Sequence, residues 1–204
     1  MPGKISIKKL DPDQDITQRW RASEILLLGG SAGAFKILFS IVKMLPVNLN
    51  KAVVIVMHRN KNFKSEMEGM FAQNSRMQFK AINDKDEIKK NTIYVAPPNY
   101  HTLIENGKYF SLDVSEPLWY SKPSIDVTFE TAADSYHSKC TAVLLSGANR
   151  DGAEGLLQLR LAGSLTIAQQ PEDAEMPEMP LAAISLGAAG YVLTAAQIFD
   201  LLTN

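Results

Sequence analysis

The sequence has little cysteine, no long hydrophobic run and almost no net charge. Its single cysteine, Cys140, excludes an intramolecular disulfide and fits a reducing compartment. No segment approaches the roughly 18 consecutive apolar residues that span a bilayer, and residues 1–21 lack the apolar core of a signal peptide. A formal net charge of -1 and a pI near 6.3 give no electrostatic case for binding nucleic acid or anionic membranes. We therefore expect a cytoplasmic protein without membrane insertion or a nucleic-acid partner.

The composition is that of one globular domain. Of 204 residues, 46% are hydrophobic and 21% charged, which allows one domain to bury a sizeable core. Residues 1–22 are polar, show no sustained period and contain a turn signal, so we expect an N-terminal arm without assigned function. No further boundary is visible, and residues 23–204 are predicted to form the functional domain.

Short apolar runs alternate with helical patterns along this domain. The runs that predict strands are residues 24–28, 52–57, 79–82, 92–96, 141–145 and 165–168. Asn106-Gly107-Lys108 between two further runs predicts an antiparallel β-hairpin. Helical spacing relates Phe63, Met67, Met70 and Phe71, and we expect the methionines in the core. The pattern predicts an α/β fold: a doubly wound, mostly parallel sheet flanked by helices, with an antiparallel β-hairpin annex.

The first apolar run ends in a serine bracketed by glycines. Gly29-x-Ser31-x-Gly33 fits the spacing of a nucleophile elbow, which exposes a serine hydroxyl on a strand-to-helix turn. An isolated match is more often an ordinary turn in which the serine is a small polar residue or cap. A dinucleotide-binding turn is not supported, because G-x-G-x-x-G fits neither register and the next strand ends in His58 rather than an acid.

Three residues of hydrolytic chemistry each follow a different predicted strand. Ser31, His58 and Asp151 come just after the first, second and fifth of these strands, and the carboxyl ends of parallel strands share one edge of the sheet. A serine needs a base to take its proton, and the base needs a carboxylate to fix its tautomer. Taken singly, a histidine at a strand end or an aspartate beside glycine is more often structural. Their shared placement favours a Ser-His-Asp triad.

The other histidines fit the base less well. The chain order of common α/β hydrolases would require His137, which lies at the polar end of a predicted helix. His101 and Met179 are candidates for the wall of the site. Histidine and cysteine do not cluster as zinc ligands do, so we expect no metal and no organic cofactor.

Six ordered blocks, running from about residue 23 to the end, resemble the catalytic domain of the chemotaxis protein-glutamate methylesterases. They are Gly29-Gly30-Ser31-Ala32-Gly33-Ala34, Val56-Met57-His58, Tyr94-Val95-Ala96-Pro97-Pro98-Asn99-Tyr100-His101, Lys122-Pro123-Ser124-Ile125-Asp126-Val127, Leu145-Ser146-Gly147-Ala148-Asn149-Arg150-Asp151-Gly152-Ala153 and Ile167-Ala168-Gln169.

The resemblance implies an α/β serine hydrolase that cleaves γ-glutamyl methyl esters on the cytoplasmic helical bundle of chemoreceptors, releasing methanol, with related enzymes also deamidating glutamines. It implies Ser31 as nucleophile, His58 as base and Asp151 as the orienting acid. Backbone N–H groups near two positions would receive the oxyanion, which makes Ala32, Gly33, Ala148 and Asn149 the oxyanion and turn residues.

The sequence departs from the family at several positions of the site. The family usually has Thr at Ala32, Gly at Ala34 and Met-Gly at Ala148-Asn149. These changes motivate an alternative, a catalytically degenerate member that binds a receptor or signalling protein, and an esterase for an unrelated small ester is a third reading. The arm before residue 23 is too short for the receiver domain usual in the family, so we expect a stand-alone catalytic domain.

Overall fold

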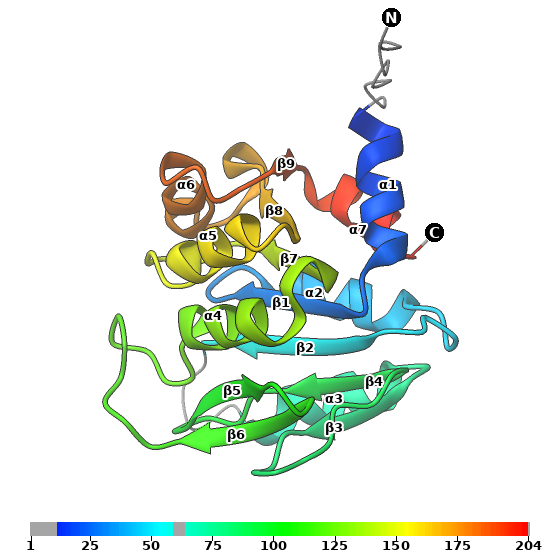
Figure 1. Ribbon diagram of the computed structural model, residues 1–204, viewed down its shortest axis with the longest axis vertical. Coiled ribbons are helices and arrows are strands. Elements are labelled where there is room, and N and C mark those ends of the chain that lie inside the picture. Colours follow the sequence, from blue (N-terminus) through cyan, green and yellow to red (C-terminus); the bar gives the residue numbers. More distant parts are fainter. Residues whose placement is uncertain (1–11, 59–63, 204) are drawn as a thin grey trace, which may run out of the picture.

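A seven-stranded parallel sheet forms the centre of the computed structural model, which describes residues 12–58 and 64–203 (Figure 1). Its order is β3-β4-β2-β1-β7-β8-β9, and every neighbouring pair is parallel. The strands are β1 (Ile25–Gly30), β2 (Ala52–Met57), β3 (Gln78–Ala81), β4 (Thr92–Val95), β7 (Cys140–Leu144), β8 (Leu165–Gln169) and β9 (Tyr191–Leu193). The central strands β1, β2 and β7 are buried along their whole length, as their continuous apolar runs predict.

Helices cover both faces of the sheet. On one face lie α4 (Ile125–Tyr136), α5 (Ala153–Leu161) and α6 (Glu178–Ser185); on the other lie α1 (Pro12–Ala22), α2 (Phe35–Met44), α3 (Lys64–Asn74) and α7 (Ala195–Thr203). Strand β1 supplies both layers, because Ile25 and Leu27 join the first core while Leu26 and Leu28 join the second. Two short 3-10 helices, η2 (His137–Lys139) and η3 (Pro171–Asp173), lie between these elements. The predicted doubly wound fold is confirmed.

The predicted hairpin is also confirmed, as a separate two-stranded sheet. Strands β5 (His101–Glu105) and β6 (Tyr109–Asp113) pair antiparallel. The hairpin packs on α4, where Thr128 Oγ1 donates to Thr102 O over 2.7 Å and Ile104 N donates to Thr131 Oγ1 over 3.0 Å. The annex is therefore attached to the helix that follows it in the chain.

The sheet reverses its winding direction between β1 and β7. The chain leaves β1 for β2 on one side through α2, and it leaves β7 for β8 on the other side through α5. Open α/β sheets bind ligands at the carboxyl ends of the strands at such a point. Ser31 follows β1, and residues 145–152 follow β7, so both segments lie at this position.

Three local features differ from prediction. Part of the expected arm is helix α1, whose Ile16 and Trp20 are buried and whose Arg19 donates to Ser164 O over 2.8 Å; residues 1–11 lie outside the described residues. The short edge strand β9 was not predicted. Met70 is 42% exposed, so its assignment to the core is wrong, whereas Met67 and Phe71 are buried and Phe63 lies outside the described residues. None of the helices in the described part of the chain is long and apolar enough to cross a bilayer.

Candidate active site

Ser31 and His58 lie side by side at the ends of adjacent strands. Gly30 pairs with Met57 in the β1–β2 register, so the next residue on each strand is Ser31 and His58. His58 N–H donates to Gly30 O over 3.1 Å, and Ser31 N–H donates to Ser146 O over 2.9 Å. Neighbouring strands are about 4.8 Å apart, so the structure brings the predicted nucleophile and base together.

The turn around Ser31 has no room for larger residues. Gly33 has φ +83°, and a Cβ there would lie 2.5 Å from Ser146 Oγ. Gly147 lies in the loop after β7, across the switch point, which is the place between β1 and β7 where the sheet reverses its winding. A Cβ at Gly147 would lie 3.1 Å from Ser31 Cβ and would collide with Met179 Cε. Met179 is fully buried, so it packs beneath this contact instead of lining an open wall. Both glycines let backbone segments close around the serine.

Asp151 is a fully buried carboxylate that accepts four hydrogen bonds. Its Oδ2 accepts from His58 Nε2 over 2.6 Å and from Ile125 N over 2.7 Å. Its Oδ1 accepts from Ser124 Oγ over 2.8 Å and from Asp126 N over 3.0 Å. Three of these donors belong to the start of α4, with Ser124 at its N-cap. The base is therefore joined to a carboxylate that the N-terminus of a helix holds in place.

The environment keeps Asp151 ionised. Burial raises the energy of the charged form, but the hydrogen bond and charge of His58 and the N–H groups of Ile125 and Asp126 outweigh it, so the pKa of Asp151 lies below its usual value. A carboxylate has no proton to donate. The proton between the two side chains is accordingly on His58 Nε2, which leaves Nδ1 as the basic nitrogen.

A second buried carboxyl, Asp126, adjoins the first. Burial and the nearby charge of Asp151 raise the pKa of Asp126 to about 7, against the hydrogen bonds from Gly155 N and the Trp119 indole. The two neighbouring carboxyls thus lose their protons at well-separated pH values, and Asp151 ionises at the lower one. This pairing concentrates the negative charge on the carboxyl that contacts His58.

The basic nitrogen of His58 faces a residue that sequence reasoning missed. Ser121 Oγ lies 3.2 Å from His58 Nδ1. Within residues 12–58 and 64–203, no hydrogen bond joins Ser31 Oγ to the imidazole. Ser31 and His58 are adjacent through their backbones, and His58 Nδ1 contacts Ser121 in place of Ser31.

The candidate oxyanion and turn residues lie on both sides of Ser31. Ala32 and Ala148 are exposed, and across the described residues neither backbone N–H has a protein acceptor. Asn149 acts through its side chain: its Nδ2 donates to Trp119 O over 3.3 Å, and its Oδ1 accepts from Asp151 N over 3.2 Å. The two free N–H groups can receive an oxyanion, while Asn149 braces the surrounding loops.

His101 lies behind the acid, away from any open wall. It is 1% exposed; Ser124 N–H donates to its Nδ1 over 3.1 Å, and its Nε2 lies 3.0 Å from Glu116 O. Through Ser124 it supports the helix start that holds Asp151. The Pro123-Ser124 pattern at a helix start was the available signal for Ser124.

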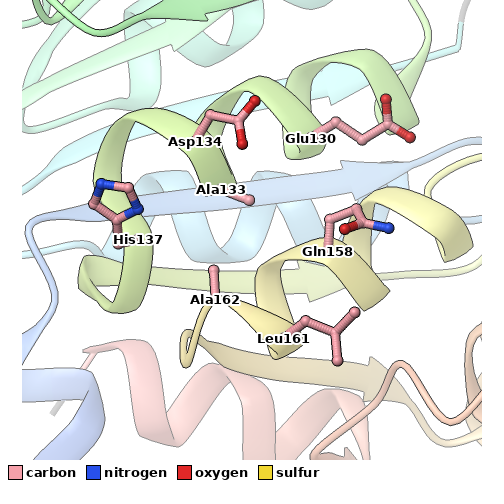
Figure 2. Close-up of a pocket in the computed structure, with 7 residues that line it drawn as sticks. All are labelled: Glu130, Ala133, Asp134, His137, Gln158, Leu161 and Ala162. Atoms are coloured by element: carbon pink, nitrogen blue, oxygen red, sulfur yellow. The ribbon is translucent and has the colours of Figure 1, made fainter.

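One pocket lies away from these residues. It has a volume of about 500 Å³ and lies between the C-terminal halves of α4 and α5, as Figure 2 shows, lined by Glu130, Ala133, Asp134, His137, Gln158, Leu161 and Ala162. A smaller pocket of about 380 Å³ reaches the Ser31 turn through Gly33. The described residues contain no group of three His, Cys, Asp or Glu side chains that could hold a metal ion.

Comparison with known proteins gives a consistent family assignment. The sequence profile of the CheB methylesterase family matches residues 26–202. A protein of Leptospira interrogans, provisionally named a protein-glutamate methylesterase/protein-glutamine glutaminase, is 39% identical over 178 residues, which are 87% of this chain and 92% of that protein. The Thermotoga maritima enzyme of the same name is 32% identical over 90% of this chain, which spans 54% of that enzyme.

A solved structure agrees with the sequence comparisons. The crystal structure of the Thermotoga maritima CheB methylesterase catalytic domain superposes with a TM-score of 0.83 at 32% identity, and the match covers 89% of this chain and 97% of that domain. The similarity therefore extends over most of this chain and nearly all of that domain.

Proposed function

Because this chain belongs to the CheB methylesterase family, we propose that it is a serine hydrolase that cleaves γ-glutamyl methyl esters on the cytoplasmic helical bundle of chemoreceptors and releases methanol. Deamidation of glutamines in the same bundle is the companion reaction, as the names of its relatives suggest. The protein would act in the cytoplasm, where that bundle lies. The observation that carries the proposal is the His58–Asp151 pair, which lies at the switch point beside Ser31.

The first half-reaction transfers the glutamyl group to the enzyme. Ser31 Oγ attacks the ester carbonyl carbon while its proton passes to His58 Nδ1. The resulting oxyanion accepts hydrogen bonds from Ala32 N–H and Ala148 N–H. When the C–O bond to the methoxy group breaks, the imidazolium returns the proton and methanol leaves. Ser31 then carries the glutamyl group as an ester.

The second half-reaction restores the enzyme. Water loses a proton to His58 Nδ1 and attacks the acyl carbon, the bond to Ser31 Oγ breaks, and Ser31 regains a proton. The products are the free enzyme and a glutamic acid side chain, which loses its proton to water and becomes a carboxylate. A glutamine side chain follows the same course with ammonia as the leaving group.

Asp151 acts through His58 in both steps. Its carboxylate fixes the proton on Nε2, so that Nδ1 is free to accept one, and it stabilises the imidazolium that forms. The lowered pKa of Asp151 keeps this charge in place at neutral pH.

The test is methanol release from a methylated chemoreceptor cytoplasmic fragment. The parent protein and Ser40→Ala should release methanol equally, because Ser40 is exposed on α2 and its hydroxyl donates only to Lys36 O in its own helix. Ser31→Ala should release none, and a serine-directed phosphonate should label Ser31 in the parent protein. No release by the parent protein, or release that survives in Ser31→Ala, would contradict the proposal.

A further inference from the structure

The basic nitrogen of His58 is held by a hydroxyl from a distant loop. Ser121 lies 63 positions from His58 in the chain, yet its Oγ is 3.2 Å from Nδ1. Both ring nitrogens of His58 are thus hydrogen-bonded, Nε2 to Asp151 and Nδ1 to Ser121. Its side chain is only 10% exposed, which limits access of water to either nitrogen.

The loop that carries Ser121 is fixed by several independent contacts. Ser121 N–H donates to Leu118 O over 2.8 Å, which closes the turn. The Trp119 indole donates to Asp126 Oδ2 over 3.1 Å, and the Arg150 guanidinium lies 4.8 Å from the centre of the indole ring. Asn149 Nδ2 reaches both Trp119 O and Ser121 Oγ. The position of Ser121 is therefore set by residues on the loops that follow β6 and β7 and by Asp126 on α4.

The backbone of this turn adopts an uncommon conformation. Trp119 has φ +49° and Tyr120 has φ +60°, the left-handed region that large side chains rarely adopt. Such strain persists where surrounding contacts enforce it, and it concentrates at functional sites. Here the turn directs Tyr120 to solvent and Ser121 toward the base.

We propose that Ser121 is a positioning residue for His58, which holds the imidazole in one orientation while Nδ1 gains and loses the proton of Ser31. The inference rests on the esterase activity proposed above. A hydroxyl suits this task because it both donates and accepts. With neutral His58, Ser121 Oγ–H donates to Nδ1. When Ser31 presents its proton, the Ser121 proton turns to Trp119 O, 3.3 Å away, which frees the lone pair of Nδ1 for that proton, and Ser121 Oγ then shares Nδ1–H with the oxygen at the reacting carbon.

Ser121→Ala removes this hydroxyl and leaves Asp151 and Ser31 in place. We expect kcat for methanol release to fall about tenfold, as for the loss of one hydrogen bond, with KM unchanged because Ser121 contacts the base and not the substrate. Ser121→Thr, which keeps the hydroxyl, should restore kcat to about the parent value. The matched control is Ser115→Ala on the same loop, whose hydroxyl donates to Asp113 and should leave both constants unchanged.

Each other outcome overturns the inference. A parent-like kcat in Ser121→Ala shows that the contact is incidental, and a higher kcat shows that Ser121 restrains the base. A change in KM alone identifies a substrate contact, and phosphonate labelling of Ser121 in place of Ser31 makes Ser121 the nucleophile.

A parent protein without methanol release refutes the proposed function and not this inference, which can still be measured by NMR relaxation of the His58 ring. The imidazole should be rigid in the parent protein and mobile in Ser121→Ala. Equal mobility in the two proteins would exclude the positioning role.

Discussion

Replacing Asp151 by asparagine keeps the size of the side chain and removes its charge. In the native protein each carboxylate oxygen accepts two hydrogen bonds, one of them from a backbone N–H of α4. An amide has one oxygen and one NH2 group. Either orientation of the new amide therefore points an N–H at Ile125 N–H or at Asp126 N–H, and a donor faces a donor in a fully buried site.

Both consequences have a calculable size. A buried donor without a partner costs about 1–3 kcal/mol of folding stability. Removing the carboxylate that fixes the tautomer of the base lowers kcat by about 10⁴-fold in a Ser-His-Asp triad, so a loss of turnover of about that size is expected here. If the amide NH2 faces His58 Nε2, the ring must also move its proton to Nδ1 and can no longer act as a base.

The assay is methanol release together with urea unfolding, for the parent protein, Asp151→Asn and Asp134→Asn. Asp134 is an exposed aspartate on the outer side of α4, so its replacement should change neither rate nor stability by much. Parent-like turnover in Asp151→Asn would refute the role assigned to the carboxylate. A large loss of stability with unchanged turnover of the folded fraction would make Asp151 a purely structural residue.

Three further predictions concern packing, pH and metal removal. Gly155→Ala would place a Cβ 2.7 Å from Asp126 O, so urea unfolding should show a free energy of unfolding lower by about 1–3 kcal/mol. At Gly69 on α3 a Cβ would have nothing within 4 Å, so Gly69→Ala should raise the free energy of unfolding by up to about 1 kcal/mol. Because burial raises the pKa of Asp126 from 3.8 to about 7, the folded protein binds a proton that the unfolded chain has released, and stability should fall by up to about 4 kcal/mol between pH 4 and 7. Asp126→Asn should remove that slope in urea titrations at pH 5 and 7, and an unchanged slope would assign it to other groups. Dialysis against EDTA should leave methanol release unchanged, since no step uses a metal; lost activity that zinc restores would contradict the mechanism.

The sheet could be predicted because its central strands are buried on both faces. Residues 52–57 form one uninterrupted apolar run, and β2 occupies those residues. The elements that escaped prediction have weaker patterns. Helix α1 buries only Ile16 and Trp20 among the residues whose burial is described, and β9 is a three-residue edge strand that is partly exposed. Both elements form by packing against the rest of the sheet. The hydrophobic periodicity of their own short segments does not indicate such packing.

That Ser31, His58 and Asp151 lie at one edge of the sheet could be predicted from chain order, because Ser31 and His58 directly follow their strands and Asp151 lies in the loop after a third strand. Ser121 and Asp126 could not. Ser121 reaches His58 only through a left-handed turn at Trp119 and Tyr120, and neither aromatic residue carries a local signal for that conformation. Asp126 stands in the first turn of a helix, where an acid is ordinary, and its burial depends on the close approach of Gly155. Such contacts join residues far apart in the chain.

Because the N-terminus of α4 hydrogen-bonds to Asp151, turnover requires that α4 is packed in its native position. The hydroxyl and the imidazole come from the ends of two adjacent strands, but three of the four hydrogen bonds to the buried anion come from a helix start some 26 positions earlier in the chain. A compact intermediate with a formed sheet and an undocked helix would therefore contain every reactive side chain and still be inert. Enzymatic activity can thus report native packing in refolding experiments, where helical content alone would count such intermediates as folded.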